Sequence, residues 1–556
     1  MREINEAWKK TCKILLGGEI GELARFEGHL SRFVTPLSSK KSAISGIGVA
    51  VHEGSFCKGA QFISNSESEK AGPVSASRPL DINSIKDMDS ILDALGGRVY
   101  YSGNIVLGNS SNVRLTNRCV NSSYIYASSN VYDSEYVAYS SIMRYMKYAF
   151  GADTVADSAF VIGGFNTTHD TRCFEVNQTF YSSDCYYVAN LEGCNECMFS
   201  FNLRNASYCI GNLALPKPAY EKIKAKLLED IRATLASKKE APRIIDFLAV
   251  RKGKPEIPAP NGGISFSKAH ALQPGKGASS NFQSSQEQIP RAAALEKINS
   301  AWGETAMLVF GKKLGQLSDY GAWLQGHVPP PRKSKSVASG TGMVIPNWHF
   351  FKPVKDFVAF EESLELGRQS LSKTEVETLT LAKATETLKR LSLTSPWFYR
   401  KSIGMVDVAI SREAQYCYWG SIYVFSRYCA YCHWPRDSQY VFGSNLVFSS
   451  KFCIKCHDSN GLTRCFEVSD SNNCSDCYFC HNCEGMQDCM FCFNTKNKKY
   501  AIFNVELGKG KYLELKKSVL ARITGELGKN KSLGIDIFNL GCLPAKMKQE
   551  RSIKQR

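Results

Sequence analysis

The sequence of 556 residues predicts a mainly β protein made of two tandem-duplicated parallel β-helices with flanking α-helices. Three observations predict this fold class: a six-residue spacing of small or apolar residues, the return of the same pattern later in the chain, and a sorting of side chains at intervals of 24 residues. Neither the period of a helix nor the alternation of a strand gives a six-residue spacing. A stacked β-solenoid does, because each unit of six supplies one short strand and a corner.

The six-residue spacing continues without a gap from about Asn112 to Asn212. Val113, Cys119 and Ile125 begin a series that continues at every sixth residue to Cys209. The pattern returns 292 residues later, so the sequence contains two copies of the repeat. Stacked strands satisfy backbone groups between coils, which favours a regular spacing of this kind.

The number of units in one coil follows from comparing residues 18 and 24 positions apart. At 24, one column is mainly aromatic in both copies: Tyr126, Phe150, Phe174 and Met198, then Tyr418, Phe442, Phe466 and Met490. At 18 the chemical classes mix. We therefore predict about 24 residues per coil, coils about 4.8 Å apart, and a right-handed helix in preference to a left-handed one. The flanking helices are expected to cover the aromatic columns; the alternative is that these rings, next to arginine, stack bases or sugars.

The sequence of the first half predicts a cap, a β-helix and a terminal helix, followed by a linker. Residues 1–96 form a helical and α+β cap, with Trp8 and Leu15 in an apolar helical stripe. Residues 97–216 form the first β-helix, and residues 217–240 form a helix packed on its end. A cap on the first coil would protect the open sheet edge there. Residues 241–292, which are rich in Pro, Gly and Ser, are expected to be a flexible linker.

The second half repeats this order. Trp8 and Gly17 return as Trp302 and Gly311, at an offset of 294 residues. Residues 293–396 form the second cap, residues 397–508 the second β-helix, and residues 509–556 a helix with a basic tail. The sequence has no uninterrupted run of 18 apolar residues and no leader pattern, so a cytoplasmic location is the expectation.

Cysteine is unusually frequent. The 21 cysteines are spread through a long chain, which favours free thiols or metal ligands over disulfides. In the second copy, three cysteine pairs end in histidine and recur every 24 residues, which would place thiols and imidazoles about 5 Å apart. Such ligands suit zinc or an iron–sulfur cluster. The candidate metal ligands are Cys453, Cys456, His457, Cys474, Cys477, Cys480, His481 and Cys483.

Packing is the favoured interpretation of the same cysteines, and the sequence requires no cofactor. Cys453 and Cys480 correspond to Val161 and Val188 in the first copy. Cysteine is a small apolar side chain when it is buried, so it can replace valine inside a β-helix. A metal or iron–sulfur carrier that uses the second β-helix is therefore the alternative, not the leading hypothesis.

A carbohydrate-active β-helix enzyme is a third possibility, because paired carboxylates cleave glycosides. The acids retained in both copies are Glu175 and Glu467, Asp184 and Asp476, and Glu192 and Glu484. However, Arg172 lies 24 residues before Glu196, which predicts an ion pair between coils on the surface. We assign no catalytic residue, and the sequence favours a non-enzymatic protein.

The charge of the chain points to an anionic partner. The net charge is +17, and the segment from Gly508 to Arg556 contains 12 Lys or Arg against four Asp or Glu. Its last basic residues are the candidate nucleic-acid contacts: Lys546, Lys548, Arg551, Lys554 and Arg556. The leading hypothesis is an interaction scaffold for RNA, or for a ribonucleoprotein such as the ribosome. Protein partners are also possible, and no membrane association is expected.

The end of each repeat resembles a known group of proteins. The residues are Glu192-Gly-Cys-Asn-Glu-Cys-Met-Phe-Ser-Phe-Asn202, Tyr208-Cys-Ile-Gly-Asn212 and Tyr220-Glu-Lys222. They resemble cysteine- and tyrosine-rich β-helix repeat proteins of unassigned function from small-genome microbes. The architecture is also similar, more loosely, to β-helical scaffolds of iron–sulfur cluster assembly. The first resemblance implies the fold and no activity, and the second transfers no residue.

Overall fold

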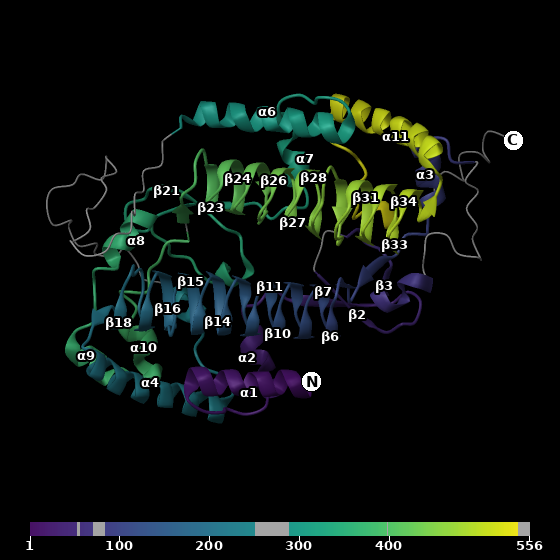
Figure 1. Cartoon of the computed structure of the whole chain (residues 1–556). Helices are drawn as coiled ribbons and strands as arrows, with labels where there is room; N and C mark the ends of the chain where they lie inside the picture. Colours follow the sequence, from purple (N-terminus) through teal and green to yellow (C-terminus); the bar gives the residue numbers. More distant parts are fainter. Residues whose placement is uncertain (53–55, 71–83, 251–288, 397, 543–556) are drawn as a thin grey trace. The chain divides into compact units, whose positions relative to one another are not determined.

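The computed structural model describes residues 1–52, 56–70, 84–250, 289–396 and 398–542 (Figure 1). The chain divides into two compact units. Unit 1 consists of Met1–Leu37, Val106–Ser280 and Arg332–Phe398, and unit 2 of Ser38–Ile105, Asn281–Pro331 and Tyr399–Arg556. Each unit therefore contains segments from both halves of the chain. Within the described residues, no helix is long and apolar enough to cross a membrane.

Unit 1 is built on a stack of short strands, called the first stack. Its strands are β5 (Val106–Leu107), β6 (Ser111–Arg114), β7 (Asn117–Val120), β8 (Ser123–Tyr126), β9 (Ser129–Tyr132), β10 (Glu135–Ala138), β11 (Ser141–Arg144), β12 (Lys147–Phe150), β13 (Asp153–Ala156), β14 (Ala159–Thr168), β15 (Thr171–Phe180), β16 (Tyr186–Glu192), β17 (Asn195–Met198), β18 (Ser207–Ile210) and β19 (Leu213–Ala214). The other elements are α1 (Arg2–Leu16), α2 (Glu27–Ser31), α4 (Lys217–Lys238), α5 (Ile244–Ala249), the hairpin β20 (Arg332–Lys335) and β21 (Gly342–Ile345), α8 (Phe360–Leu366), α9 (Lys373–Thr378) and α10 (Leu381–Thr387).

Unit 2 contains the second stack. Its strands are β22 (Phe398–Arg400), β23 (Val406–Arg412), β24 (Gln415–Val424), β25 (Arg427–Cys432), β26 (Gln439–Phe442), β27 (Asn445–Phe448), β28 (Lys451–Ile454), β29 (His457–Asn460), β30 (Phe466–Ser469), β31 (Ser475–Glu484), β32 (Gln487–Met490), β33 (Phe493–Lys496), β34 (Lys499–Ile502) and β35 (Val505–Glu506). The other elements are β1 (Leu37–Lys41), β2 (Gly48–His52), β3 (Phe62–Ser64), α3 (Met88–Leu95), β4 (Tyr101–Gly103), α6 (Arg291–Phe310), α7 (Gly321–Gln325) and α11 (Lys509–Asn530).

Apart from the end strands β5, β19 and β35, the strands of each stack pair in parallel with a register of twelve residues; β19 and β35 pair antiparallel. In the first stack, Glu135 pairs with Lys147 and Ser123, and Ser141 pairs with Asp153. The order β6-β8-β10-β12 forms one ladder and β7-β9-β11-β13 the other. The chain therefore alternates between two ladders, and one coil contains two strands. This parallel arrangement fits a β-helix.

The predicted coil of about 24 residues is wrong, because the register of the strands is half of that. Val441 pairs with Cys453, and Cys477 pairs with Cys489, in both cases twelve residues along the chain. An interval of 24 residues spans two coils, so residues 24 apart share a column just as residues twelve apart do. An interval of 18 residues is one and a half coils and mixes the columns. Of the two intervals, 24 therefore sorts the side chains better, although it is twice the true period.

A left-handed backbone conformation at every third residue turns the chain between the ladders. In one coil, φ is 58° at Tyr124, 45° at Ala127 and 53° at Asn130. Such values are unfavourable for residues other than glycine, so neighbouring coils must hold them in place. Inward serines contribute to this: the backbone N of Ser134 donates to Ser122 Oγ at 3.0 Å, and Ser122 Oγ donates to the carbonyl of Val120. These serine hydroxyls thereby satisfy both themselves and backbone groups of the neighbouring coil.

Long helices cover one side of each stack, as the sequence predicts. In unit 1, α1 lies along β8, β10, β12 and β14, and Trp8 packs edge-on against Phe150 at 5.3 Å between ring centroids. In unit 2, α6 lies along β24, β25, β26 and β28 (Figure 1), where Trp302 contacts Phe442. Phe150 and Phe442 are fully buried. The aromatic columns are therefore part of the core under the helices.

A further segment covers each stack, and it comes from the other half of the chain. The segment Arg332–Phe398, here called the unit 1 cover, packs on the first stack, and Ser38–Ile105, the unit 2 cover, packs on the second. Equivalent contacts secure both: Asn202 Nδ2 donates to the carbonyl of Leu393, and Asn494 Nδ2 donates to that of Tyr100, each at 2.9 Å. The predicted domains instead group each cap with the β-helix that follows it in the sequence.

Candidate functional site

The predicted metal-binding cysteines lie inside the second stack. Cys453, Cys456, Cys474, Cys477, Cys480 and Cys483 belong to one buried core cluster. Four of them, Cys474, Cys477, Cys480 and Cys483, follow one another at every third residue and so supply all the inward positions of a single coil. They replace the serines, valines and other small residues of the remaining coils. The sequence correctly indicates that these cysteines fill interior positions.

The columns predicted from the 24-residue interval form, but with twice the predicted spacing. Cys453 and Cys477 lie in one column with Cys465 between them, twelve residues from each, so the two are two coils apart. His457 pairs with Ser469, which in turn pairs with His481. Neighbouring coils are about 4.8 Å apart, so residues two coils apart are separated by about twice that distance.

The cysteine cluster offers no ready ligand set for a metal. Among the described residues, no group of three or more His, Cys, Asp or Glu side chains is arranged to hold a metal ion. Burial raises the pKa of Cys477 and of Cys483 well above that of an ordinary thiol, whereas the pKa of Cys480 is lowered despite its burial because these two thiols hydrogen-bond to it. Metals bind the thiolate, which such burial disfavours. The zinc or iron–sulfur site stays a prediction that this geometry does not support.

The two candidate histidines lie outside this interior. Both ring nitrogens of His481 are engaged: Nε2 accepts from the backbone N of Ser102 at 3.0 Å, and Nδ1 lies 2.8 Å from Ser469 Oγ and 3.3 Å from Asp470 Oδ2. His457 is buried, with its ring 5.0 Å from that of Phe538. The imidazoles thus hold the unit 2 cover and the C-terminal segment on the second stack.

The acids predicted for a carbohydrate-cleaving site are all in ion pairs. The pairs are Glu175 with Arg243, Glu467 with Lys455, Asp184 with Arg172, Asp476 with Arg464, Glu192 with Arg204 and Glu484 with Lys496. The predicted pairing of Arg172 with Glu196 is wrong, because the coil is twelve residues long and Asp184 is the neighbour. Each of these carboxylates faces a cation, whereas the two carboxylates of a glycosidase face each other across the substrate.

Glu175 anchors a segment that was predicted to be linker. Residues 241–250 include α5, and the fully buried Arg243 donates from Nε to Glu175 Oε1 at 2.5 Å. The backbone N of Ile244 donates to Glu175 Oε2 at 2.8 Å. Burial raises the pKa of Glu175 to about 7. The rest of the predicted linker, residues 251–288, lies outside the described residues.

Unit 2 has the same anchor with its charges arranged differently. The backbone N of Ile537 donates to Glu467 Oε2 at 3.0 Å, while the cation is Lys455, with Nζ 3.6 Å from Glu467 Oε1. In unit 1 the residue at the position of Lys455 is Gly163, where a Cβ would lie 2.1 Å from Glu175 Oε1. In unit 2 the cation that faces the glutamate is Lys455 of the stack itself, and in unit 1 it is Arg243 of the segment after α4.

Two rows of stacked aromatic rings follow the edge of the stacks, a feature that the 24-residue interval concealed. The rows are Tyr124, Tyr136, Tyr148 and Phe160, and Tyr416, Tyr428, Tyr440 and Phe452. In the first row the centroids are 4.6 to 4.9 Å apart and the planes within 9° of parallel. Neighbouring rings already cover both faces of each inner ring, so a base or sugar cannot stack on the inner rings.

A basic surface lies on α11. Seven Lys or Arg occur between Lys509 and Lys531, against Glu514 and Glu526. Lys509, Lys517 and Lys529 are exposed, and none of them has a carboxylate within 4.0 Å among the residues that the structure describes. The predicted tail contacts, Lys546, Lys548, Arg551, Lys554 and Arg556, lie outside the described residues.

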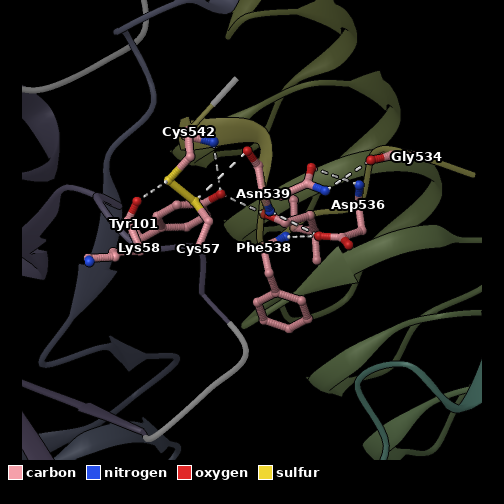
Figure 2. Close-up of a disulfide and its surroundings, with 10 residues drawn as sticks. Cys57, Lys58, Tyr101, Gly534, Asp536, Phe538, Asn539 and Cys542 are labelled. Atoms are coloured by element: carbon pink, nitrogen blue, oxygen red, sulfur yellow. Dashed lines mark hydrogen bonds between the residues drawn. A yellow bond between two sulfur atoms is a disulfide. The ribbon is translucent and has the colours of Figure 1, made fainter. Parts of the chain in front are cut away.

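A disulfide joins Cys57 to Cys542, which corrects the expectation of free thiols or metal ligands for these two residues (Figure 2). The other nineteen cysteines are free and buried. Cys57 and Cys542 lie outside the six-residue repeats, so the sequence does distinguish them from most of the cysteines. It could not pair them, because 485 residues separate them.

Comparisons with protein-family models, curated proteins and solved structures find no match for this chain. The features that the structure brings together are a cysteine-filled interior, neutralised acids and an exposed basic helix.

Proposed function

We propose that the protein is a non-enzymatic interaction scaffold that binds RNA, or a ribonucleoprotein such as the ribosome, through α11 and the basic tail. In this proposal the two stacks are right-handed β-helices that arose by tandem duplication. The hexapeptide Thr-Arg-Cys-Phe-Glu-Val occurs identically at 171–176 and 463–468, which supports the duplication. The stacks supply a rigid support, and the basic residues supply the binding energy.

The observation that carries the proposal is the basic surface of α11. Its exposed lysines at 509, 517 and 529 have no acidic partner among the described residues, and the sequence adds five further basic residues after residue 542. Lysines that neutralise phosphates release condensed counterions, and this release is a large source of affinity for nucleic acids. Surface lysines that only solubilise a protein are usually interspersed with acids.

Two features support a scaffold over an enzyme. Each acid retained in both copies is already paired with a cation, so none is poised as a general acid or base. The aromatic rows stack on themselves, which favours contacts to phosphates over contacts to bases.

The salt dependence of RNA binding tests the proposal. We expect affinity for a structured RNA to fall steeply with salt, and the variant K509Q/K517Q/K529Q to lower the slope of log Kobs against log salt by about 2. The matched control K312Q/K313Q/K383Q removes three exposed lysines elsewhere and should leave the slope unchanged. An affinity that does not change with salt concentration, or an equal change of slope in both variants, would contradict a site on α11.

The tail is tested separately. Replacing Lys546, Lys548, Arg551, Lys554 and Arg556 by glutamine removes five positive charges. If the tail contributes, the slope should fall further than in the α11 variant, because more phosphate contacts are lost. An unchanged slope would restrict the site to the helix.

Metal analysis tests the alternative of a metal or iron–sulfur carrier. Protein purified without oxygen should contain far less than one zinc or iron per chain if the cysteines serve only to pack. One or more tightly held metal ions per chain would favour the carrier and contradict the scaffold proposal.

A further inference from the structure

The disulfide in unit 2 ties the unit 2 cover to the segment that follows α11. The Cα atoms of Cys57 and Cys542 are 6.2 Å apart, a usual separation for a bridge. Cys57 belongs to the cover and Cys542 to the last described turn of the chain, and both are half-buried. Every other cysteine is buried. The sulfur atoms of the bridge are thus more accessible to a dissolved reductant than those of the other cysteines.

The contacts around the bridge hold the same two segments together without covalent bonds (Figure 2). Tyr101 Oη donates to the carbonyl of Ile537 at 2.8 Å and accepts from the backbone N of Gly541 at 3.1 Å. The backbone N of Cys57 donates to the carbonyl of Phe538 at 3.3 Å. These few polar contacts and the rings of Phe56 and Phe538, 5.2 Å apart, would remain if the bridge were opened.

Unit 1 shows how a cover is held without a disulfide. The sequence Phe56-Cys57-Lys58 corresponds to Phe350-Phe351-Lys352 in the unit 1 cover. Phe351 is almost fully buried and packs against Trp348 and Phe357, with centroids 5.6 and 5.7 Å away. A buried aromatic side chain contributes a large apolar area, which a half-buried cysteine lacks. In unit 2 a covalent bond takes the place of this packing.

We propose that Cys57–Cys542 is a reversible thiol–disulfide latch, opened by a dithiol reductant of the thioredoxin-like class. One thiolate of the reductant attacks a sulfur of the bridge and releases the other cysteine as a thiolate, which takes up a proton. The second thiolate of the reductant then attacks the reductant's own sulfur in this mixed disulfide, which closes the reductant's disulfide and releases the remaining cysteine as a thiolate that also takes up a proton. Two cysteines are reduced and one dithiol is oxidised, so electrons balance. With the latch open, these non-covalent contacts alone join the unit 2 cover to the C-terminal segment at this point, so the two segments separate more often and Tyr101 and Phe538 become transiently exposed.

Hydrogen exchange of the full chain with and without a dithiol tests the latch. On reduction, amides in peptides covering 99–105 and 534–542 should exchange at least about tenfold faster, because local opening no longer has to stretch a cross-link. The equivalent unit 1 peptides, covering 241–249 and 392–396, serve as internal controls and should not change. Reoxidation should restore the slow exchange.

The variant C57S/C542S provides the second measurement. It should exchange like reduced wild-type protein and should not respond to the dithiol. The latch is refuted if reduction leaves exchange at 99–105 and 534–542 unchanged, or if both units accelerate equally. It is also refuted if the dithiol does not expose two additional thiols. None of these results depends on RNA binding.

Discussion

Asp170 is a carboxyl group inside the first stack, at a position where neighbouring coils place Ser158 and Ser182. It is fully buried, and its Oδ1 accepts from the backbone N of Ser182 at 2.9 Å, while Thr179 Oγ1 bonds its other oxygen. Burial raises the pKa of Asp170 to about 8. The side chain is therefore neutral in the folded protein at pH values where it is charged in the unfolded chain.

This shift predicts how stability changes with pH. A raised folded pKa means that the contribution is fully present below the unfolded pKa near 3.8 and is lost as pH rises towards about 8. D170N keeps the shape without the charge. We expect the free energy of unfolding of D170N, relative to wild type, to increase by on the order of 5 kcal/mol between about pH 4 and pH 8. Urea denaturation across this range measures it, and a difference that does not vary with pH would contradict the buried, neutral Asp170.

The ion pair between Arg243 and Glu175 gives a second prediction at this scale. Both side chains are fully buried, so R243M would leave Glu175 and the carbonyls of His29 and Gly151 without their hydrogen-bond donor and cost about 3 to 5 kcal/mol of stability. R32M is the control. Arg32 is half exposed and pairs with Asp246 of α5, the short helix that begins directly after Arg243. It should cost at most about 1 kcal/mol. Comparable losses in chemical denaturation would show that α5 is not anchored as described.

At the scale of elements, the sequence predicts the stacked short strands and their helical covers correctly. The six-residue spacing follows directly from the alternation of strand and corner, and Phe150 and Phe442 belong to buried columns. The coil length was missed because even multiples of a period look like the period itself. That error displaced the metal prediction, since His457 and His481 are neighbours only in a 24-residue coil.

The inward cysteines predict a measurable difference between folded and unfolded protein. All nineteen free cysteines are buried, so the native chain should react with almost no Ellman's reagent. In denaturant the chain should show nineteen thiols, and two more after reduction of the bridge. Rapid reaction of several thiols in the native state would mean that the second stack is not closed around its sulfur atoms.

At the scale of the whole molecule, each half of the chain supplies a cover for the stack of the other half. Sequence alone could not reveal this. The two covers have similar sequences, so either one could pack on either stack, and each cover precedes the stack of its own half in the chain. Only contacts such as that of Asn494 with Tyr100 distinguish the two arrangements. The basic tail and residues 251–288 stay predictions from composition.

The exchanged covers predict that the halves stay together when the chain is cut. A protease site inserted between Asn261 and Gly262 allows cleavage of the full-length folded protein. The two fragments should co-elute in size-exclusion chromatography even under reducing conditions, because unit 1 needs 332–398 and unit 2 needs 38–105. Separation of the fragments without denaturant would contradict the exchange.

The register of twelve residues underlies the whole account, and engineered cross-linking tests it most directly. Glu135 pairs with Lys147, which pairs with Ala159 one coil further on. Under mild oxidation, E135C/K147C should form a disulfide readily, because adjacent strands place the two positions about 4.8 Å apart, whereas E135C/A159C should not. A disulfide in E135C/A159C and none in E135C/K147C would contradict the twelve-residue coil.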